Sequence, residues 1–241
     1  MSKFTRPAYL KFPQIYSTFK ALNKAGDAEI EYQIRDLPED LFEKAMEILM
    51  KEFVPEETIC VACDLKNNKP ACDDSYMIWY ETLLERFSVG CFTNDGSDEL
   101  AGVTIMTVPT LNFDPFENMQ FNENISKEML KLFDFTLNAE KVYEKYNVDK
   151  YLTDYGICIR KEFRNRGIAL EFIKSRTQMM KMLNIQVTST SYTVIATQKA
   201  AIKAGHFESY SILYKELQQK FPSFDFSKSN ADMYKVMDFK I

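Results

Sequence analysis

The sequence predicts an α/β (α+β) protein in which one central mixed sheet is covered by helices. The chain has 241 residues, of which 46% are hydrophobic, and this supports one compact core. Segments that alternate apolar and polar residues are interleaved with segments of helical periodicity, as in a sheet flanked by helices. A hairpin signal early in the chain and a pair of strand-like runs near its end indicate that the sheet is mostly antiparallel.

Residues 1–27 are basic, aromatic and aperiodic, and they predict an N-terminal extension that packs irregularly or frays. The remainder, residues 28–241, is predicted to be a single domain with about seven strands. The predicted strands are residues 30–34, 88–93, 100–108, 151–159, 185–192, 206–214 and 233–239. The predicted helices are residues 38–54, 75–87, 126–146, 168–183 and 196–204.

Alternation, caps and turn residues justify these elements in order. Residues 30–34 alternate like a half-buried strand, and the helix after them ends before Pro55, because the residue preceding a proline disfavours helical backbone. Asp73-Asp74-Ser75 is a capping sequence for the second helix. Gly96 tolerates positive φ and marks the hairpin turn between residues 93 and 100.

The later elements have equally local signals. The helix over residues 126–146 has an apolar face wide enough to lie on a sheet. Residues 151–183 follow the order strand, tight turn, helix. Residues 185–192 are β-branched and alternating, and Gly205 ends the short helix that follows as a left-handed cap.

The overall charge argues against two classes of partner. The net charge is −5, from 35 acidic and 30 basic residues that are well mixed along the chain. No basic stripe is present for a nucleic acid or an anionic membrane, and no stretch approaches the roughly 20 apolar residues that span a bilayer. The N-terminal residues also lack the apolar core of a signal peptide. We expect a cytoplasmic protein that binds neither nucleic acid nor membrane.

Five cysteines, an odd number, agree with a reducing compartment. Cys60 and Cys63 are separated by two residues, as zinc ligands often are, and Cys72 is nearby. A fourth ligand at usable spacing is missing, and the single histidine, His206, is far along the chain. We therefore favour structural cysteines and predict no metal. One histidine also argues against a histidine-dependent triad, so the expected base is a carboxylate.

The most informative stretch is Arg164-Asn165-Arg166-Gly167-Ile168-Ala169, at a predicted strand–helix junction. Backbone N–H groups at a helix N-terminus lack intrahelical partners and bind phosphate groups, and Gly167 lets a ligand approach the backbone. Lys161 and the two arginines add positive charge. The junction predicts a phosphorylated cofactor, although many basic junctions are simple connections.

This stretch resembles a known family signature. Residues 164–169 match the R/Q-x-x-G-x-G/A motif of the GNAT acetyltransferases, residues 157–159 look like the strand that pairs with pantetheine, and residues 204–207 resemble the family's closing motif. The resemblance implies the GNAT fold, with splayed fourth and fifth strands, and acetyl-CoA as cosubstrate. The residues implied to bind it are Ile157, Cys158, Ile159, Arg164, Asn165, Arg166, Gly167, Ile168, Ala169 and Leu170.

A second motif narrows the resemblance. Residues 53–59 are similar to the F-x-P-D-E-P-L segment of insect arylalkylamine N-acetyltransferases, with Thr58 in place of the second proline. The match implies that Glu57 is the general base and acts through ordered water. An alkylammonium with a pKa near ~10.4 must lose a proton before it attacks a thioester, so a carboxylate suits this role. Without the GNAT signature, Glu56 and Glu57 would be read as solvated loop residues.

The same family has one serine on its fifth strand and another at the start of the following helix, and the corresponding positions here are Thr193 and Thr197. We expect their hydroxyls to relay a proton or to position the cosubstrate. The position of the tyrosine that many GNAT enzymes use as general acid is Ala201. That version of the mechanism is therefore in doubt.

The predicted function is acetylation of a small primary amine, such as dopamine, tyramine or serotonin, by direct attack on acetyl-CoA. Polyamine or agmatine substrates, a longer acyl chain, a protein substrate and a non-catalytic acyl-CoA binding module remain alternatives. The expected partners are the amine and CoA. We expect a monomer or a weak homodimer.

Overall fold

The computed structural model describes residues 3–229 and 231–241. Its strands are β1 (Ile15–Leu22), β2 (Glu29–Asp36), β3 (Val89–Thr93), β4 (Leu100–Thr107), β5 (Thr153–Ile159), β6 (Val187–Tyr192), β7 (Phe207–Leu213) and β8 (Met233–Lys240). Its α-helices are α1 (Phe42–Ile48), α2 (Thr58–Ala62), α3 (Lys69–Leu83), α4 (Asn124–Glu140), α5 (Val142–Tyr146), α6 (Ile168–Leu183), α7 (Ile195–Lys203) and α8 (Tyr214–Lys220). Shorter turns of helix are η1 (Glu39–Leu41), η2 (Leu49–Phe53), η3 (Leu65–Asn67), η4 (Lys161–Phe163) and η5 (Phe226–Lys228).

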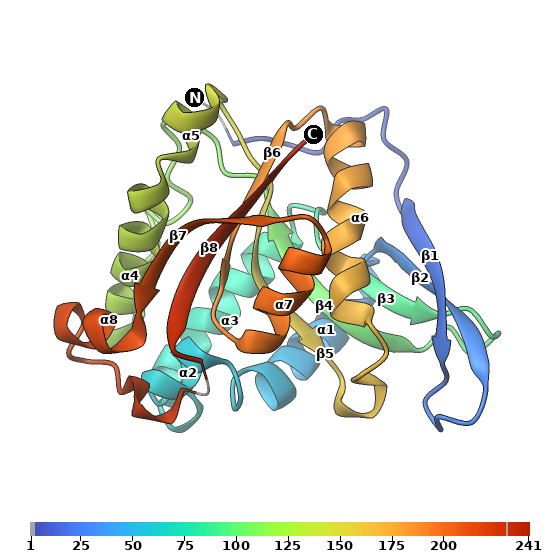
Figure 1. Ribbon diagram of the computed structural model, residues 1–241, viewed down its shortest axis with the longest axis horizontal. Coiled ribbons are helices and arrows are strands. Elements are labelled where there is room, and N and C mark those ends of the chain that lie inside the picture. The colour runs from blue at the N-terminus through green and yellow to red at the C-terminus, as the bar shows by residue number, and fades with distance from the viewer. Residues whose placement is uncertain (1–2, 230) are drawn as a thin grey trace.

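The strands form two antiparallel sheets, which confirms the α+β class, in place of the one central mixed sheet with splayed strands that we expected. The first sheet has the order β1-β2-β3-β4-β5 and the second has the order β6-β8-β7. Between β5 and β6 there is a parallel bridge, Leu152 with Thr188, just before β5 begins. Beyond this bridge the two strands diverge (Figure 1). The break between the sheets therefore opens beside β5.

The N-terminal segment is more regular than the sequence predicted. Residues 15–22 form β1, which pairs antiparallel with β2, so the expectation of an irregular segment is wrong for these residues. Tyr16 is buried, and Phe19 stacks on Tyr32 of β2 with ring centroids 5.4 Å apart. Arg6 binds the fully buried carboxylate of Asp36. These contacts hold a strand whose own alternation is weak.

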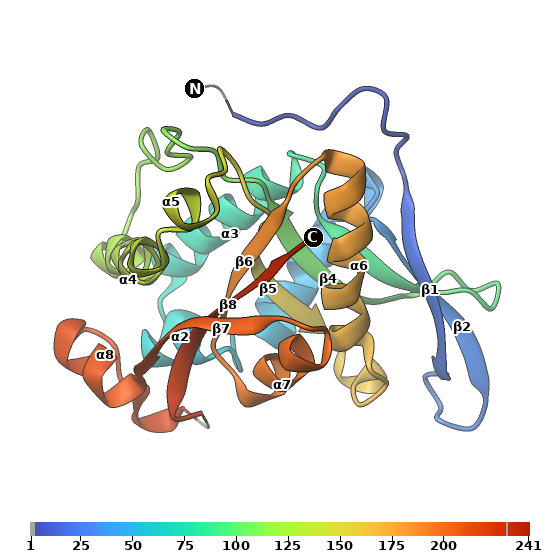
Figure 2. The ribbon, with the colours of Figure 1, turned by 45° about the horizontal axis from the view of Figure 1, so that its top comes forward.

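Helices cover both faces of the first sheet. On one face, α6 packs Phe172 and Met179 against the sheet together with Val89 of β3. On the other face, α1 and α3 contribute Met46 and Trp79 to a second core cluster. Figures 1 and 2 show α6 crossing the sheet on the side opposite to α1 and α3. The gap beside β5 is thus flanked by rigid, well-packed elements.

Two helix boundaries differ from the prediction for identifiable reasons. Asn68, not Asp73 or Asp74, caps α3, since its side chain accepts a hydrogen bond from the Ala71 amide at 3.1 Å. Asp74 is instead buried and accepts from the Ser126 hydroxyl at 2.6 Å, tying α3 to α4. The predicted helix over residues 126–146 is interrupted by Lys141, whose φ is 49°, and forms α4 and α5.

No helix in the described part of the chain is long and apolar enough to cross a membrane.

Candidate functional site

A cavity of about 1450 Å³ lies where β5 and β6 diverge. Its walls come from β5, the end of β6, the N-terminal turn of α6, the start of α7, and the segment that carries α2. Most of the residues singled out in the sequence line it, and they come from elements far apart in the chain. The fold therefore gathers the two motifs around one space.

The free edge of β5 faces this cavity. The Arg160 amide donates to the Ala101 carbonyl at 3.0 Å, and Cys158 pairs with Val103 of β4. Because pairing alternates along an antiparallel strand, the backbone groups of Ile157 and Ile159 point to the opposite edge. The Ile159 carbonyl accepts from Arg164 Nε at 3.0 Å on that side. The Cys158 side chain is buried and its backbone groups point to β4, so only Ile157 and Ile159 of the three predicted residues offer backbone groups on the free edge.

A bulge shapes the middle of β5. The register shifts between Thr104 and Met106 on β4, and opposite this shift Gly156 adopts a φ of +143°, which L residues rarely adopt. A Cβ on Gly156 would lie 2.8 Å from the Phe53 ring. Trp79 Nε1 donates to the Tyr155 carbonyl at 3.1 Å. The bulge is therefore fixed by close contacts on one side of the strand.

A buried arginine spans the base of the gap. Arg176 of α6 forms an ion pair with Asp154 of β5, and donates to Thr190 Oγ1 at 2.9 Å and to the Tyr192 hydroxyl at 3.3 Å on β6. Asp154 in turn accepts from the Gly156 amide at 2.9 Å. Arg176 thus links both diverging strands to α6 and supports the bulge through Asp154. Nothing in the sequence motifs indicated this residue.

The turn before α6 has the open geometry that a large ligand requires. Gly167 has a φ of +77°, and a Cβ placed there would meet nothing within 4 Å. The helix begins at Ile168, so the amides of Ile168, Ala169 and Leu170 lie in its first turn, where N–H groups have no intrahelical acceptor. Asn165 is also in the left-handed region, with a φ of 62°. The residues of this turn line the cavity, except Arg166.

The Arg166 side chain contacts the β1–β2 hairpin. Its guanidinium donates to the carbonyls of Leu22, Asn23 and Lys24, at 2.7 to 3.0 Å, and so anchors the turn between β1 and β2. The side chain therefore does not line the cavity, because its donors are used on the hairpin. The β1–β2 hairpin had not been foreseen from the sequence, so this role had no visible signal.

The two neighbouring glutamates have different environments. Glu56 is exposed and pairs with Lys161 at 3.0 Å and with Arg164 at 2.7 Å. Partial burial opposes its ionisation, but the hydrogen bonds to these cations outweigh burial and hold the pKa of Glu56 below its usual value. Glu56 therefore neutralises part of the positive charge beside the α6 turn.

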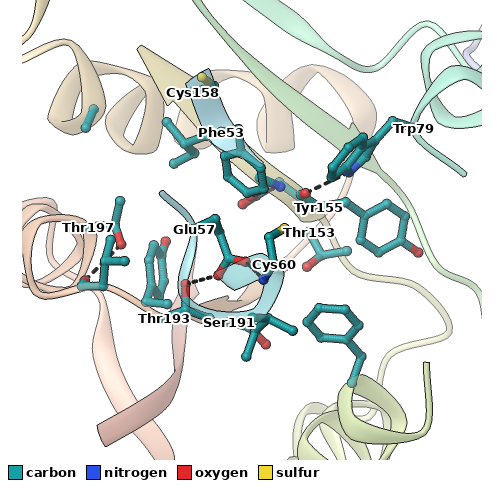
Figure 3. Close-up of a pocket in the computed structure, with 18 of the residues that line it drawn as sticks. Phe53, Glu57, Cys60, Trp79, Thr153, Tyr155, Cys158, Ser191, Thr193 and Thr197 are labelled. Carbon is teal, nitrogen blue, oxygen red and sulfur yellow. Dashed lines mark hydrogen bonds between the residues drawn. The ribbon is translucent and has the colours of Figure 1, made fainter. Parts of the chain in front are cut away.

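Glu57 is half-buried and lines the cavity. It caps α2, since its Oε2 accepts from the Cys60 amide at 2.8 Å, and its Oε1 accepts from Thr193 Oγ1 at 2.6 Å (Figure 3). The Thr193 carbonyl accepts from the Tyr214 hydroxyl at 2.8 Å and from Thr58 Oγ1 at 3.1 Å. The carboxylate is thus held in one orientation by groups that are themselves fixed.

The two predicted threonines are not equivalent. Thr193 contacts Glu57, whereas Thr197 Oγ1 donates to the Val194 carbonyl at 3.1 Å within the first turn around α7. Figure 3 shows Thr197 on the side of the cavity away from Cys60 and Tyr155. Both residues line the cavity, but the structure joins only Thr193 to the carboxylate.

The wall of the cavity is rich in aromatic side chains, which include Phe53, Trp79, Phe116, Phe133 and Tyr155. Two of its acidic side chains already have partners, since Glu52 accepts from the Lys161 amide and Asp154 is paired with Arg176. Rings of this kind contact both flat apolar groups and cations. The aromatic content was visible in the composition, but the gathering of these rings in one cavity was not.

All five cysteines are buried and free. Burial raises the pKa of Cys60, which lines the cavity, and the nearby charge of Glu57 raises it further. A thiol kept protonated in this way is a poor nucleophile. In the described residues no group of three or more potential ligands is arranged to hold a metal ion.

A protein of the yellow fever mosquito Aedes aegypti, assigned as arylalkylamine N-acetyltransferase 7, matches with a TM-score of 0.92 and 29% identity over 99% of both chains. The chain resembles the insect arylalkylamine N-acetyltransferases of the GNAT superfamily. No family model matches the sequence, and no curated protein sequence is detectably similar.

Two further structures share the fold. Arylalkylamine N-acetyltransferase 2 of Aedes aegypti matches with a TM-score of 0.74 and 18% identity over 87% of this chain and 99% of its own. A polyamine N-acetyltransferase of Drosophila melanogaster, described as forming N-acetylagmatine, matches with a TM-score of 0.70 and 11% identity over 87% of this chain and all of its own. The resemblance to the insect arylalkylamine N-acetyltransferases thus extends well beyond the two short motifs.

Proposed function

We propose that the protein is an acyl-CoA-dependent N-acyltransferase that transfers the acetyl group of acetyl-CoA to a small primary amine. The observation that carries this proposal is the position of Glu57. Its carboxylate, fixed by Thr193, lines the same cavity as the free edge of β5 and the first turn of α6. A base, a strand edge and an anion-binding turn around one space are what this reaction needs.

The cosubstrate fits the residues that line the cavity. Pantetheine is an extended chain with amide groups, and the backbone of Ile157 and Ile159 offers it hydrogen bonds in the manner of an added strand. The pyrophosphate would lie on the amides of residues 165–170, where Gly167 leaves open space. Lys161 and Arg164 supply positive charge, moderated by Glu56.

The proposed reaction is direct attack. Glu57 attracts the substrate ammonium and accepts a proton from it through an ordered water, which leaves a free amine. The amine nitrogen then forms a bond to the thioester carbonyl carbon, and a backbone N–H of β5 stabilises the negative charge on oxygen. Collapse breaks the carbon–sulfur bond. The nitrogen loses its second proton and the CoA sulfur takes one up, giving the N-acetylamine and free thiol.

The environment of Glu57 supports catalysis over simple binding. A non-catalytic acyl-CoA module would not require a carboxylate that is half-buried and oriented by two hydrogen bonds. The aromatic lining, together with the carboxylate of Glu57, supports a cationic arylalkylamine as the amine.

The test is release of free thiol from acetyl-CoA in the presence of a panel of amines. The panel contains arylalkylamines, spermidine, agmatine and a lysine peptide. We expect turnover with arylalkylamines. If no member of the panel is acetylated, the proposal fails and the protein is better described as a binding module.

A further inference from the structure

A hydroxyl outside both sequence motifs lies in the wall of the cavity. Ser191 is half-buried near the end of β6, where the other residues of the strand are buried, and it lines the cavity. In Figure 3 it lies, with Thr153 and Tyr155, on the side of Glu57 away from Thr197. This is the side on which the aromatic residues gather, away from the turn before α6.

A buried tyrosine fixes the direction of the Ser191 hydrogen bond. The Tyr234 hydroxyl of β8 donates to Ser191 Oγ at 2.6 Å, and Thr136 Oγ1 of α4 lies 3.0 Å from the same phenol oxygen. Tyr234 is fully buried, and burial raises its pKa to about 12, so the phenol keeps its proton. Because Ser191 Oγ already accepts one hydrogen bond, its own hydrogen remains available for another acceptor.

No acceptor for that hydrogen is found among the residues that the structure describes, and the adjoining space is the cavity. Ser191 and Thr193 have different partners, Tyr234 and Glu57. We therefore expect Ser191 to contact a different part of a ligand from the part that Glu57 and Thr193 hold.

We propose that Ser191 is a specificity-determining hydrogen-bond donor of the amine pocket, which selects arylalkylamines with a hydroxyl or similar oxygen acceptor on the ring. This inference rests on the proposed function. With the amino group at Glu57 and the ring among Phe133 and Tyr155, a ring oxygen accepts the Ser191 hydrogen. An amine without that oxygen leaves the donor unpaired, and this lowers its transition-state binding.

The test compares kcat/KM for amines that differ by one hydroxyl: 2-phenylethylamine, tyramine and 3-hydroxyphenethylamine. In the wild-type protein, we expect one or both hydroxylated amines to be preferred over 2-phenylethylamine by about 3- to 10-fold. Ser191→Ala should remove this preference by lowering kcat/KM for the hydroxylated amines to about the value for 2-phenylethylamine. Ser211→Ala, which removes a β7 serine hydroxyl bonded to Glu208, is the matched control and should keep the preference.

The outcomes separate this proposal from the one on which it rests. If the amines are acetylated and Ser191→Ala keeps the wild-type preference, or lowers all three substrates equally, Ser191 is not a specificity residue and the acetyltransferase function stands. The same holds if the wild-type protein shows no preference. If no amine is acetylated, the proposed function fails and the Ser191 inference fails with it.

Discussion

At the scale of single residues, the adjacent glutamates at positions 56 and 57 have different surroundings. Glu57 faces the cavity and is held by Cys60 and Thr193, while Glu56 faces the cations beside the α6 turn. The motif in the sequence indicated Glu57 but not its orienting partner, because Thr193 is 136 residues away along the chain. A contact of this kind depends on the fold and leaves no local pattern.

This difference predicts the behaviour of two conservative variants. Glu57→Gln keeps an oxygen that can cap α2 but cannot take a proton, so kcat should fall by about 10²- to 10⁴-fold with little change in acetyl-CoA affinity. Steady-state kinetics and calorimetry give the two quantities. Glu56→Gln is the control. The kcat of this variant should change by less than about threefold, because the Glu56 carboxylate forms ion pairs with Lys161 and Arg164. Equal losses in both variants would attribute the effect to general loop electrostatics.

At the scale of elements, the strand–turn–helix unit of β5 and α6 was the part most visible in the sequence. Its glycine, its basic residues and the helical periodicity after it are all local signals, and α6 begins at Ile168 as expected. The short helix α2 was missed, because five residues are too few for a helical pattern to repeat. The strand β1 was missed as well, since its burial comes from contacts with β2 and Arg6 rather than from its own alternation.

The turn before α6 gives a prediction about cosubstrate affinity. Gly167→Glu places a carboxylate in the open space where the pyrophosphate would approach, so CoA affinity measured by calorimetry should fall at least about 100-fold. Any L residue here is strained, because φ is +77°. Gly167→Ala carries the same strain without charge or length, and it should bind CoA within about fivefold of wild type. Comparable losses in both variants would trace the effect to backbone strain.

The ion pair between α6 and β5 gives a prediction about stability. Arg176→Met leaves the buried carboxylate of Asp154 without its partner, and the free energy of unfolding should fall by about 3 to 5 kcal/mol. The double variant Asp154→Asn/Arg176→Met removes both charges and should recover part of this loss. Lys174→Met, on the exposed side of the same helix, is the control and should change stability by less than about 1 kcal/mol. Urea unfolding measures all three, and a double variant no better than Arg176→Met would contradict the account.

At the scale of the whole molecule, composition and periodicity predicted the α+β class, while the separation into two sheets was implied only by the family resemblance. The reason is physical: the contacts of Gly156 with Phe53 and of Arg176 with β5 and β6 join segments distant in sequence, and such contacts leave no local pattern. The aromatic content was visible in the composition, but its concentration in one cavity follows from the packing of α3, α4 and β5.

The single histidine gives the whole molecule a defined response to acid. His206 is buried between Tyr192 and Phe239. Burial and the positive charge of Arg176 lower the pKa of His206, while the negative charge of Asp238 raises it, and the net effect is a fall from 6.5 to about 3. Between pH 6.5 and about pH 3, the folded protein therefore binds fewer protons than the unfolded chain. The stability contributed by neutral His206 is complete above pH 6.5 and is lost as the pH falls toward about 3.

When the pH falls from 6.5 to about 5, protonation of His206 in the unfolded chain should lower the unfolding free energy of the wild-type protein by about 2 kcal/mol. His206→Phe keeps an aromatic ring in the stack and removes the titration, so its loss over the same interval should be smaller by that amount. Urea unfolding at the two pH values measures the difference. Parallel pH profiles for the two proteins would show that His206 is not responsible.

The unpaired edge of β5 also bears on self-association. A strand with free backbone donors and acceptors is a template on which another chain can add a strand, and many proteins protect such edges with charges or prolines. Here the edge carries Ile157 and Ile159 instead, and it is recessed between α6 and the end of β6. A second polypeptide strand would have to fit side chains on both of its faces between these elements, whereas pantetheine carries none. The position of the edge therefore favours a slender ligand over an added polypeptide strand.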